Sequence, residues 1–262
     1  MSDTLQGAVK SADRVLDLFE FLAHAGREMA HNEIADVLQI PKSSLTQLLR
    51  NLIARGYVEV TPNGRGYRLG ATLLSLSQSA GQVRDLVAQA DAFLAEITRE
   101  TGESSALNQL KGDQAEVVAT IIGPARLVTH MRLGDLAPLY ATSGGKAILA
   151  HLSASFQDEY LGRVRFEAAT PGTLRSAKAL RKQLDAVRET GFAYSHEEWT
   201  PGIVGIGVPV LDASGAPLGA INVAVPAARF DASLKAKSEA ALRRITDDLR
   251  RHLVPRGAPS PG

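Results

Sequence analysis

Residues 40–60 read IPKSSLTQLLRNLIARGYVEV, and this stretch decides the fold of the first part of the chain. Its apolar residues recur three and four positions apart, which predicts an amphipathic helix over about 42–55. They are Leu45, Leu48, Leu49, Leu52 and Ile53. Pro41 suits the first turn of that helix, because the N–H that proline lacks would have no partner there. Gly56 ends the helix, and the residues that follow it predict a short strand.

The outer face of this helix carries no acidic side chain. It presents hydroxyls, amides and cations, namely Lys42, Ser43, Ser44, Thr46, Gln47, Arg50 and Asn51. Such groups can bond to base edges and phosphates in a DNA major groove, whereas an ordinary surface helix would carry Glu/Lys pairs. On the composition of this face alone, a solvated helix surface is an equal alternative.

A predicted hairpin directly after the helix favours DNA binding. Residues 57–60 and 67–69 predict two strands, joined by a turn with Arg65 at its tip. A helix-turn-helix followed by such a hairpin is the winged variant of the motif. A cation on the wing can reach a phosphate or the minor groove.

Two further helices are predicted upstream. Apolar spacing indicates a helix over about 11–24, ended by Gly26, and then a shorter helix with Asn32 as its N-cap. We therefore expect residues 1–70 to bind double-stranded DNA. The side chains expected at the DNA are Lys42, Ser43, Ser44, Thr46, Gln47, Arg50 and Arg65.

Composition limits the class of protein more than it defines the function. The chain has 262 residues, which is enough for two domains. Its net charge is only +1, so the overall charge does not by itself indicate binding to nucleic acid. The basic residues are concentrated instead: residues 40–70 contain Lys42, Arg50, Arg55, Arg65 and Arg68 against the single acid Glu59. No apolar run reaches the roughly 20 residues of a membrane span, and we expect a cytoplasmic protein without a membrane partner.

The remaining chain predicts an α+β domain. Residues 71–90 suggest a linker helix, and residues 91–253 alternate between helix and strand patterns. Strands are expected near 105–110, 115–122, 126–132, 203–211 and 217–225, with helices near 91–101, 145–151, 176–190 and 231–253. Residues 254–262 are rich in Pro and Gly, and we expect a disordered tail.

Catalytic and metal-binding motifs are missing from the sequence. It contains no cysteine, no G-x-S-x-G and no H-E-x-x-H, so we expect neither an enzyme nor a cofactor. The run Ser143–Lys146 departs from a phosphate-binding loop, because Ala147 replaces the hydroxyl that would bind Mg²⁺. His196, Glu197 and Glu198 could hold a metal, but a hydrogen-bonded loop is the better interpretation.

Glycines in this part of the chain leave room for a ligand. Gly144 and Gly145 precede a helix, where backbone N–H groups favour an anion. Gly202, Gly205 and Gly207 allow another group to approach their strand closely. Tight packing of the strand explains these glycines equally well.

Three segments together resemble the IclR family of bacterial transcription regulators. They are IPKSSLTQLLRNLIARGYVEV with YRLG, PLYATSGGKAILAHL, and GFAYSHEEWTPGIVGIGVPVLDASGAPLGAINVAVP. The resemblance covers about residues 8–252 and implies a GAF-like second domain. Members of the family commonly carry Arg where this chain has Gln47, so the resemblance does not define the operator sequence.

The resemblance also implies an effector site and self-association. Carried over residue by residue, the effector would lie against Thr129, Ser143, Gly144, Ser195, Ile203, Gly205 and Asn222. Dimers form through the N-terminal domains in this family, often with tetramers through the larger ones. The two DNA-binding domains of a dimer would bind a roughly palindromic operator.

We hypothesise that the effector is a small organic acid, with aromatic acids among the candidates. Ser143, the Gly144 and Gly145 amides and Asn222 would hold it, beside the only tryptophan, Trp199. Thr129 and Met131 alternate with His130 and Arg132, so whichever pair faces the site decides whether a cation is available. The alternative function is an architectural DNA-binding protein whose second domain only oligomerises.

Overall fold

The computed structural model describes residues 9–62, 64–124 and 131–253. The chain divides into two compact units, Met1–Ala80 and Gly81–Gly262. The helix α4 (Ala71–Ala88) contains the division. Within the described residues, no helix combines the length and apolar character that crossing a membrane requires.

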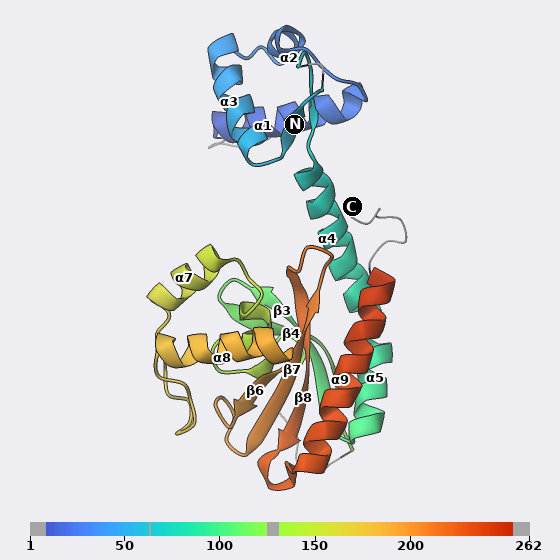
Figure 1. The fold of residues 1–262 in the computed structure, drawn as a ribbon, viewed down its shortest axis with the longest axis vertical. Helices are drawn as coiled ribbons and strands as arrows, with labels where there is room; N and C mark the ends of the chain where they lie inside the picture. Colours follow the sequence, from blue (N-terminus) through green and yellow to red (C-terminus); the bar gives the residue numbers. More distant parts are fainter. Residues whose placement is uncertain (1–8, 63, 125–130, 254–262) are drawn as a thin grey trace, which may run out of the picture. The chain divides into compact units, whose positions relative to one another are not determined.

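The first unit is a three-helix domain with a hairpin. Its elements before α4 are α1 (Lys10–Ala25), α2 (His31–Val37), α3 (Lys42–Ala54), β1 (Val58–Val60) and β2 (Tyr67–Leu69) (Figure 1). The predicted apolar stripes form its core, which includes Leu18, Leu22, Ile34, Leu45 and Leu49. The strands β1 and β2 pair antiparallel, and Met29 adds a further bridge to Tyr67.

Helix ends in this unit confirm some predictions and correct others. Gly26 ends α1 in the left-handed conformation, with φ 62°, as predicted. The prediction that Asn32 caps α2 is wrong, because the helix begins one residue earlier, at His31. Glu33 provides the cap instead, since its carboxylate accepts the Ala30 N–H at 2.8 Å. Pro41 lies at the N-cap of α3, one residue before the first turn.

The second unit is built on one antiparallel sheet of six strands in the order β5-β4-β3-β8-β7-β6. The strands are β3 (Ser104–Lys111), β4 (Gln114–Ile121), β5 (Leu136–Pro138), β6 (Ala193–His196), β7 (Ile203–Leu211) and β8 (Pro217–Pro226). The helices are α5 (Ala90–Thr101), α6 (Ser143–Leu149), α7 (Ala154–Arg163), α8 (Ala177–Thr190) and α9 (Ala232–Leu253), with a 3₁₀ turn at Ala227–Arg229.

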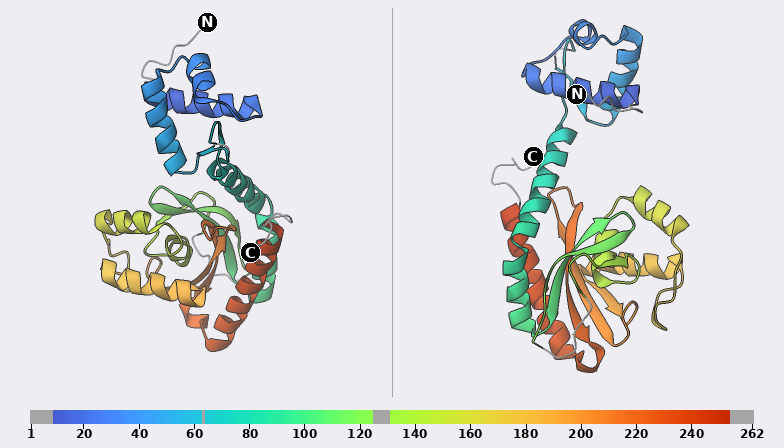
Figure 2. Two further views of the ribbon diagram at one scale, coloured as in Figure 1. Left: turned by 45° about the horizontal axis from the view of Figure 1, so that its top comes forward. Right: turned by 180° about the vertical axis from the view of Figure 1, so that it is seen from behind.

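Helices cover both faces of this sheet. One core joins α5 and α9 to strand residues such as Ile206 and Val223. A second core joins α6, α7 and α8 to small residues of the opposite face, such as Ala115 and Ala220. Both views in Figure 2 show α5 and α9 on one side and α7 and α8 on the other. The predicted α+β class is confirmed.

Short elements are where the prediction and the structure differ. Three elements were not predicted, namely β5, β6 and α7. The strands are too short to show a period, and α7 is largely polar. Most of the predicted strand at 126–132 lies outside the described residues, but Met131 and Arg132 are not in a strand. The expected tail at 254–262 also lies outside them.

Candidate DNA interface and ligand cavity

The helix α3 presents the predicted polar face to solvent. Lys42, Ser43, Thr46, Gln47 and Arg50 are exposed and Ser44 is half-buried, while Leu45, Leu49 and Leu52 are buried. Arg50 forms no ion pair with any residue of the described part of the chain, so its charge is available to a phosphate. Arg68 differs, because it pairs with Glu59.

The hydroxyl of Thr46 is engaged within the domain. It donates to the carbonyl oxygen of Lys42 at 2.8 Å, and it lies 3.0 Å from Nε2 of His31 in α2. Its only proton is therefore used, and the hydroxyl can act towards DNA only as an acceptor. The role of His31 escaped the sequence analysis, because the contact joins residues 15 positions apart on two helices.

The predicted wing residue Arg65 is exposed in the turn between β1 and β2. At the other end of this hairpin, Thr72 joins the first turn of α4 to the end of α3. Its hydroxyl donates to the Arg55 carbonyl at 3.1 Å, and its backbone N–H donates to the Gly56 carbonyl at 3.3 Å. The start of α4 is thus bonded to the carboxyl end of α3.

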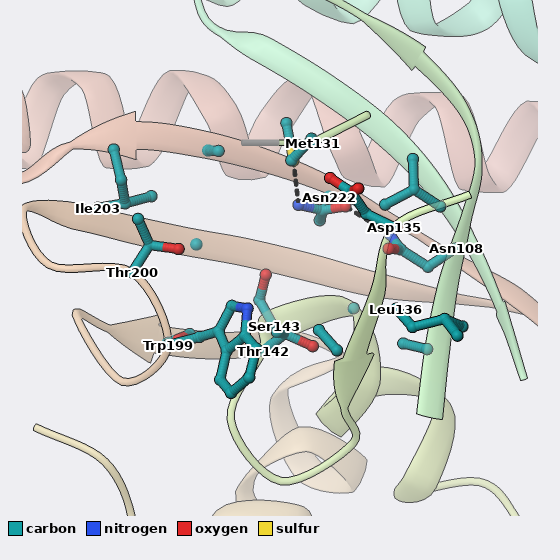
Figure 3. A pocket seen from close by; sticks show the side chains of 17 residues that line it. Asn108, Met131, Asp135, Leu136, Thr142, Ser143, Trp199, Thr200, Ile203 and Asn222 are labelled. Carbon is teal, nitrogen blue, oxygen red and sulfur yellow. Dashed lines mark hydrogen bonds between the residues drawn. The ribbon is translucent and has the colours of Figure 1, made fainter. Parts of the chain in front are cut away.

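A cavity of about 220 Å³ lies against the face of the sheet that α6 covers. We call it the sheet cavity, and Figure 3 shows the residues around it. Among the predicted effector residues, those that line it are Ser143, Gly144, Ser195, Ile203, Gly205 and Asn222. Thr129 lies outside the described residues. Trp199 lines the cavity, and so do Asn108, Asp135, Leu136 and Thr200, which were not predicted.

The strand glycines bring α6 close to the sheet. A Cβ atom on Gly207 would lie 2.8 Å from the Ser143 backbone, so this glycine permits the close packing of α6. A Cβ atom on Gly205 would lie 2.6 Å from the Ser143 hydroxyl. Gly205 also lines the cavity, so both interpretations of the glycines hold at once.

Two side chains in the cavity have hydrogen-bonding capacity to spare. Ser143 is only 2% exposed, and its hydroxyl has no hydrogen-bond partner among the described residues. Within the part of the chain that the structure describes, the side-chain amide of Asn222 donates only to the sulfur of Met131, at 3.4 Å, which is a weak acceptor. Ser195 differs, since its hydroxyl donates to the Ala141 carbonyl.

The Gly145 amide does not face a ligand, contrary to expectation. Its N–H donates to the Thr142 hydroxyl oxygen at 3.0 Å, an N-cap interaction at the start of α6. Asn108 supplies a group that the sequence analysis missed. Its Nδ2 donates to Oδ1 of Asn222 at 2.5 Å, and its own Oδ1 has no hydrogen-bond partner in the described structure.

The described lining contains one ionisable side chain, Asp135. Of the two alternating pairs on the neighbouring segment, Met131 lines the cavity, whereas Arg132 is exposed and is not part of the lining. Arg132 therefore brings no cation to the site. Its backbone N–H donates to Oδ2 of Asp135 at 2.8 Å.

The loop after β6 is held by a buried ion pair. Nζ of Lys146 lies 2.8 and 2.9 Å from the two carboxylate oxygens of Glu198 and 2.6 Å from Oε1 of Gln183. Glu197 accepts the Gly202 N–H. The described residues include no cluster of three metal-ligand side chains, and the residues 196–198 form the hydrogen-bonded loop that the sequence favoured.

A winged helix-turn-helix on the same chain as a sheet domain with a small ligand cavity defines a class of DNA-binding transcriptional regulators. Residues 11–62 match the family model of the IclR helix-turn-helix domain, and residues 78–251 match that of the bacterial transcriptional regulator IclR C-terminal domain. The chain belongs to the IclR family of transcriptional regulators, as the resemblance implied.

Several relatives resemble the chain over most of its length. The HTH-type transcriptional regulator Rv1719 of Mycobacterium tuberculosis is 35% identical over 231 residues, which are 87% of this chain and 86% of the relative. The crystal structure of the Thermotoga maritima IclR is 25% identical, with a TM-score of 0.61, and covers 93% of this chain and 98% of its own.

A third relative matches the second unit. The inducer-binding domain of the Acinetobacter PobR transcription factor, a double mutant solved with 3-hydroxybenzoic acid, is 30% identical with a TM-score of 0.57. The match covers 62% of this chain and 95% of that domain. These comparisons support the winged helix-turn-helix followed by a GAF-like effector-binding domain.

Proposed function

We propose that this regulator binds a roughly palindromic operator and that a small organic acid in the sheet cavity controls the binding. The observation that carries the proposal is the pair of buried polar side chains in the cavity, Ser143 and Asn222, whose donor groups make no hydrogen bond to an oxygen or nitrogen acceptor within the described structure. A buried polar group without a partner costs free energy, which a ligand can recover.

The DNA half of the proposal rests on the exposed face of α3. Lys42, Arg50 and the wing residue Arg65 contribute positive charge for phosphates. Gln47 is exposed and can bond an adenine with both ends of its amide. Ser43, Ser44 and Thr46 are the remaining side chains proposed to contact DNA, and Thr46 acts there as an acceptor only. The operator sequence depends chiefly on Gln47.

The ligand half rests on the size and chemistry of the cavity. Its volume of about 220 Å³ is below the roughly 300–1,000 Å³ of pockets for drug-sized ligands, so the ligand is small. A carboxylate can accept from the Ser143 hydroxyl and from Nδ2 of Asn222. Trp199, Ile203 and Leu136 offer apolar surface to a ring. The Acinetobacter PobR domain supports a small aromatic acid as a candidate.

Self-association completes the mechanism that we propose. Leu16 on α1 and Leu74 and Leu76 on α4 are more than half exposed, which supports pairing of the first units. A ligand controls DNA binding only if the protein binds it more tightly in one arrangement of the paired DNA-binding domains than in the other. The bond between Thr72 and the end of α3 would pass a movement of α4 to the DNA-contacting helix.

The fluorescence of Trp199 provides the test, because it is the only tryptophan and lines the cavity. Titration with a panel of small carboxylates should change its emission at saturable concentrations, and calorimetry should give matching affinities. Ser143→Ala should weaken binding roughly tenfold, since it removes one hydrogen bond to a charged ligand. Ser233→Ala, an exposed position on α9, is the matched control.

If no carboxylate gives either a fluorescence change or heat, the acid-effector proposal fails. If operator binding is the same with and without every bound ligand, the second unit serves assembly alone. The protein is then the architectural DNA-binding alternative.

A further inference from the structure

The turn before β5 places a carboxylate in the sheet cavity and fixes its position. The Val117 N–H of β4 donates to the Asp135 carbonyl at 2.9 Å, and the Gly134 N–H donates to the Val117 carbonyl at 2.8 Å. Within the turn, the Arg132 N–H donates to Oδ2 of Asp135. Both the backbone and one carboxylate oxygen of Asp135 are therefore held, while Oδ1 has no hydrogen-bond partner in the described structure.

Figure 3 shows the Asp135 carboxylate on the side of the cavity where Asn222 and Met131 lie. No cation in the described lining neutralises it. The Arg132 guanidinium belongs to an exposed side chain outside the lining. Lys146 is fully buried and already bonded to Glu198 and Gln183, and it does not line the cavity.

A carboxylate that no cation of the described lining neutralises sets a requirement on the ligand. It accepts hydrogen bonds and donates none, and it repels a second negative charge in a partly enclosed site. A ligand carboxylate is therefore directed to the Ser143 hydroxyl rather than towards Asp135, and the part of the ligand that meets Asp135 must carry a hydrogen-bond donor. A ligand that lacks this donor leaves Asp135 desolvated without a partner, which costs affinity.

We propose that Asp135 selects effectors that carry a hydroxyl or amino group in addition to their carboxylate. This inference rests on the proposed function, since it assumes that the sheet cavity binds an organic acid. It narrows the ligand class from organic acids in general to organic acids about the size of one ring that also carry a hydroxyl or an amino group.

A matched series of probes tests the inference. We would measure the affinities of benzoate, 3-methoxybenzoate, 3- and 4-hydroxybenzoate and 3-aminobenzoate by Trp199 fluorescence and calorimetry, in the intact protein. Comparison of the hydroxybenzoates with 3-aminobenzoate shows whether a hydroxyl or an amino group is the preferred donor. The methoxy compound controls for size, because it accepts hydrogen bonds but cannot donate them.

The wild-type protein should bind at least one donor-bearing acid roughly 10- to 100-fold more tightly than benzoate and 3-methoxybenzoate. Asp135→Asn should abolish this preference and improve the binding of the two acids without a donor. The asparagine oxygen can still accept the Arg132 N–H, so the turn is retained. Asp91→Asn, at an exposed position on α5, is the control and should keep the wild-type preference.

Two results would overturn the inference about Asp135, and only the second would also overturn the proposed acid site. If benzoate and 3-methoxybenzoate bind the wild type as tightly as the donor-bearing acids, Asp135 does not select, although the cavity still binds acids. If no member of the series binds either the wild type or Asp135→Asn, the proposed acid site and the inference fail together.

Discussion

Lys146 and Glu198 form an ion pair inside the second unit, with both side chains almost entirely buried. Lys146 belongs to the helix whose first residues line the sheet cavity, and Glu198 precedes the cavity residue Trp199. The pair therefore ties the Trp199 loop to α6. Burial lowers the pKa of the Lys146 ammonium, and the carboxylate of Glu198 opposes this change.

Breaking this pair should destabilise the protein more than replacing it. Lys146→Met leaves the Glu198 carboxylate buried without a countercharge, which should cost about 3–5 kcal/mol of unfolding free energy. The double variant Lys146→Met/Glu198→Leu removes both charges and should recover much of that loss. Urea denaturation of the wild type, the two single variants Lys146→Met and Glu198→Leu, and the double variant measures this. A double variant as unstable as the sum of both single variants would contradict it.

His151, after α6, should make the second unit sensitive to mild acid. Burial lowers its pKa below the usual value of about 6.5, and the nearby Arg188 charge acts in the same direction. The folded state then binds a proton less well than the unfolded state, so stability is full above pH 6.5 and declines as the pH falls below it. His151→Asn should lose less stability than the wild type between pH 7 and 5.5 in thermal melts. Equal losses would show that His151 contributes nothing.

Gln47 and Arg50 should affect DNA binding in different ways. Gln47→Ala should cost about 1–3 kcal/mol on the preferred sequence and relax the preference at one base pair. Arg50→Ala should weaken binding to all sequences and reduce the salt slope by about one. Selection from random duplexes, followed by salt titrations, separates the two effects. Uniform weakening by Gln47→Ala would exclude base recognition by this residue.

Thr46 should not donate to a base, because its proton is already donated to the Lys42 carbonyl. We expect Thr46→Val to lower affinity through the lost contact with His31 while the preferred operator sequence stays the same. The same selection experiment measures the preference. A changed consensus would mean that the hydroxyl takes part in base recognition, either as an acceptor or after rearranging on DNA.

The long amphipathic elements were predictable from the sequence, and contacts between distant residues were not. The leucines of α3 mark a buried face by spacing alone, and so they also defined which polar residues are exposed. No pattern in the sequence indicates that Lys146 meets Glu198, since these residues are 52 positions apart and meet only in the folded domain. In the sequence, nothing distinguishes Asn108 from an ordinary strand residue. Only the pairing of β3 with β8 places it beside Asn222.

The predicted residues that line the cavity are those for which a local signal and the family resemblance coincided. The Gly144 turn and the glycine-rich strand pointed to a close approach, and Ser143 and Gly205 do lie together. Asp135 had no such signal, because it lies in a turn beside a strand of three residues. Its position depends on backbone hydrogen bonds to β4.

Ligand control of operator binding is the central claim, and a filled cavity tests it most directly. A Cβ atom on Gly205 would lie 2.6 Å from the Ser143 hydroxyl, so Gly205→Ala should obstruct the cavity, whereas Gly162 in α7 has no neighbour within 4 Å of such an atom. The measurement is the operator dissociation constant, by fluorescence anisotropy, with and without a saturating acid. We expect a change of about 5- to 150-fold for the wild type and for Gly162→Ala, and none for Gly205→Ala although it still binds operator. A ligand effect that persists unchanged in Gly205→Ala would contradict the account.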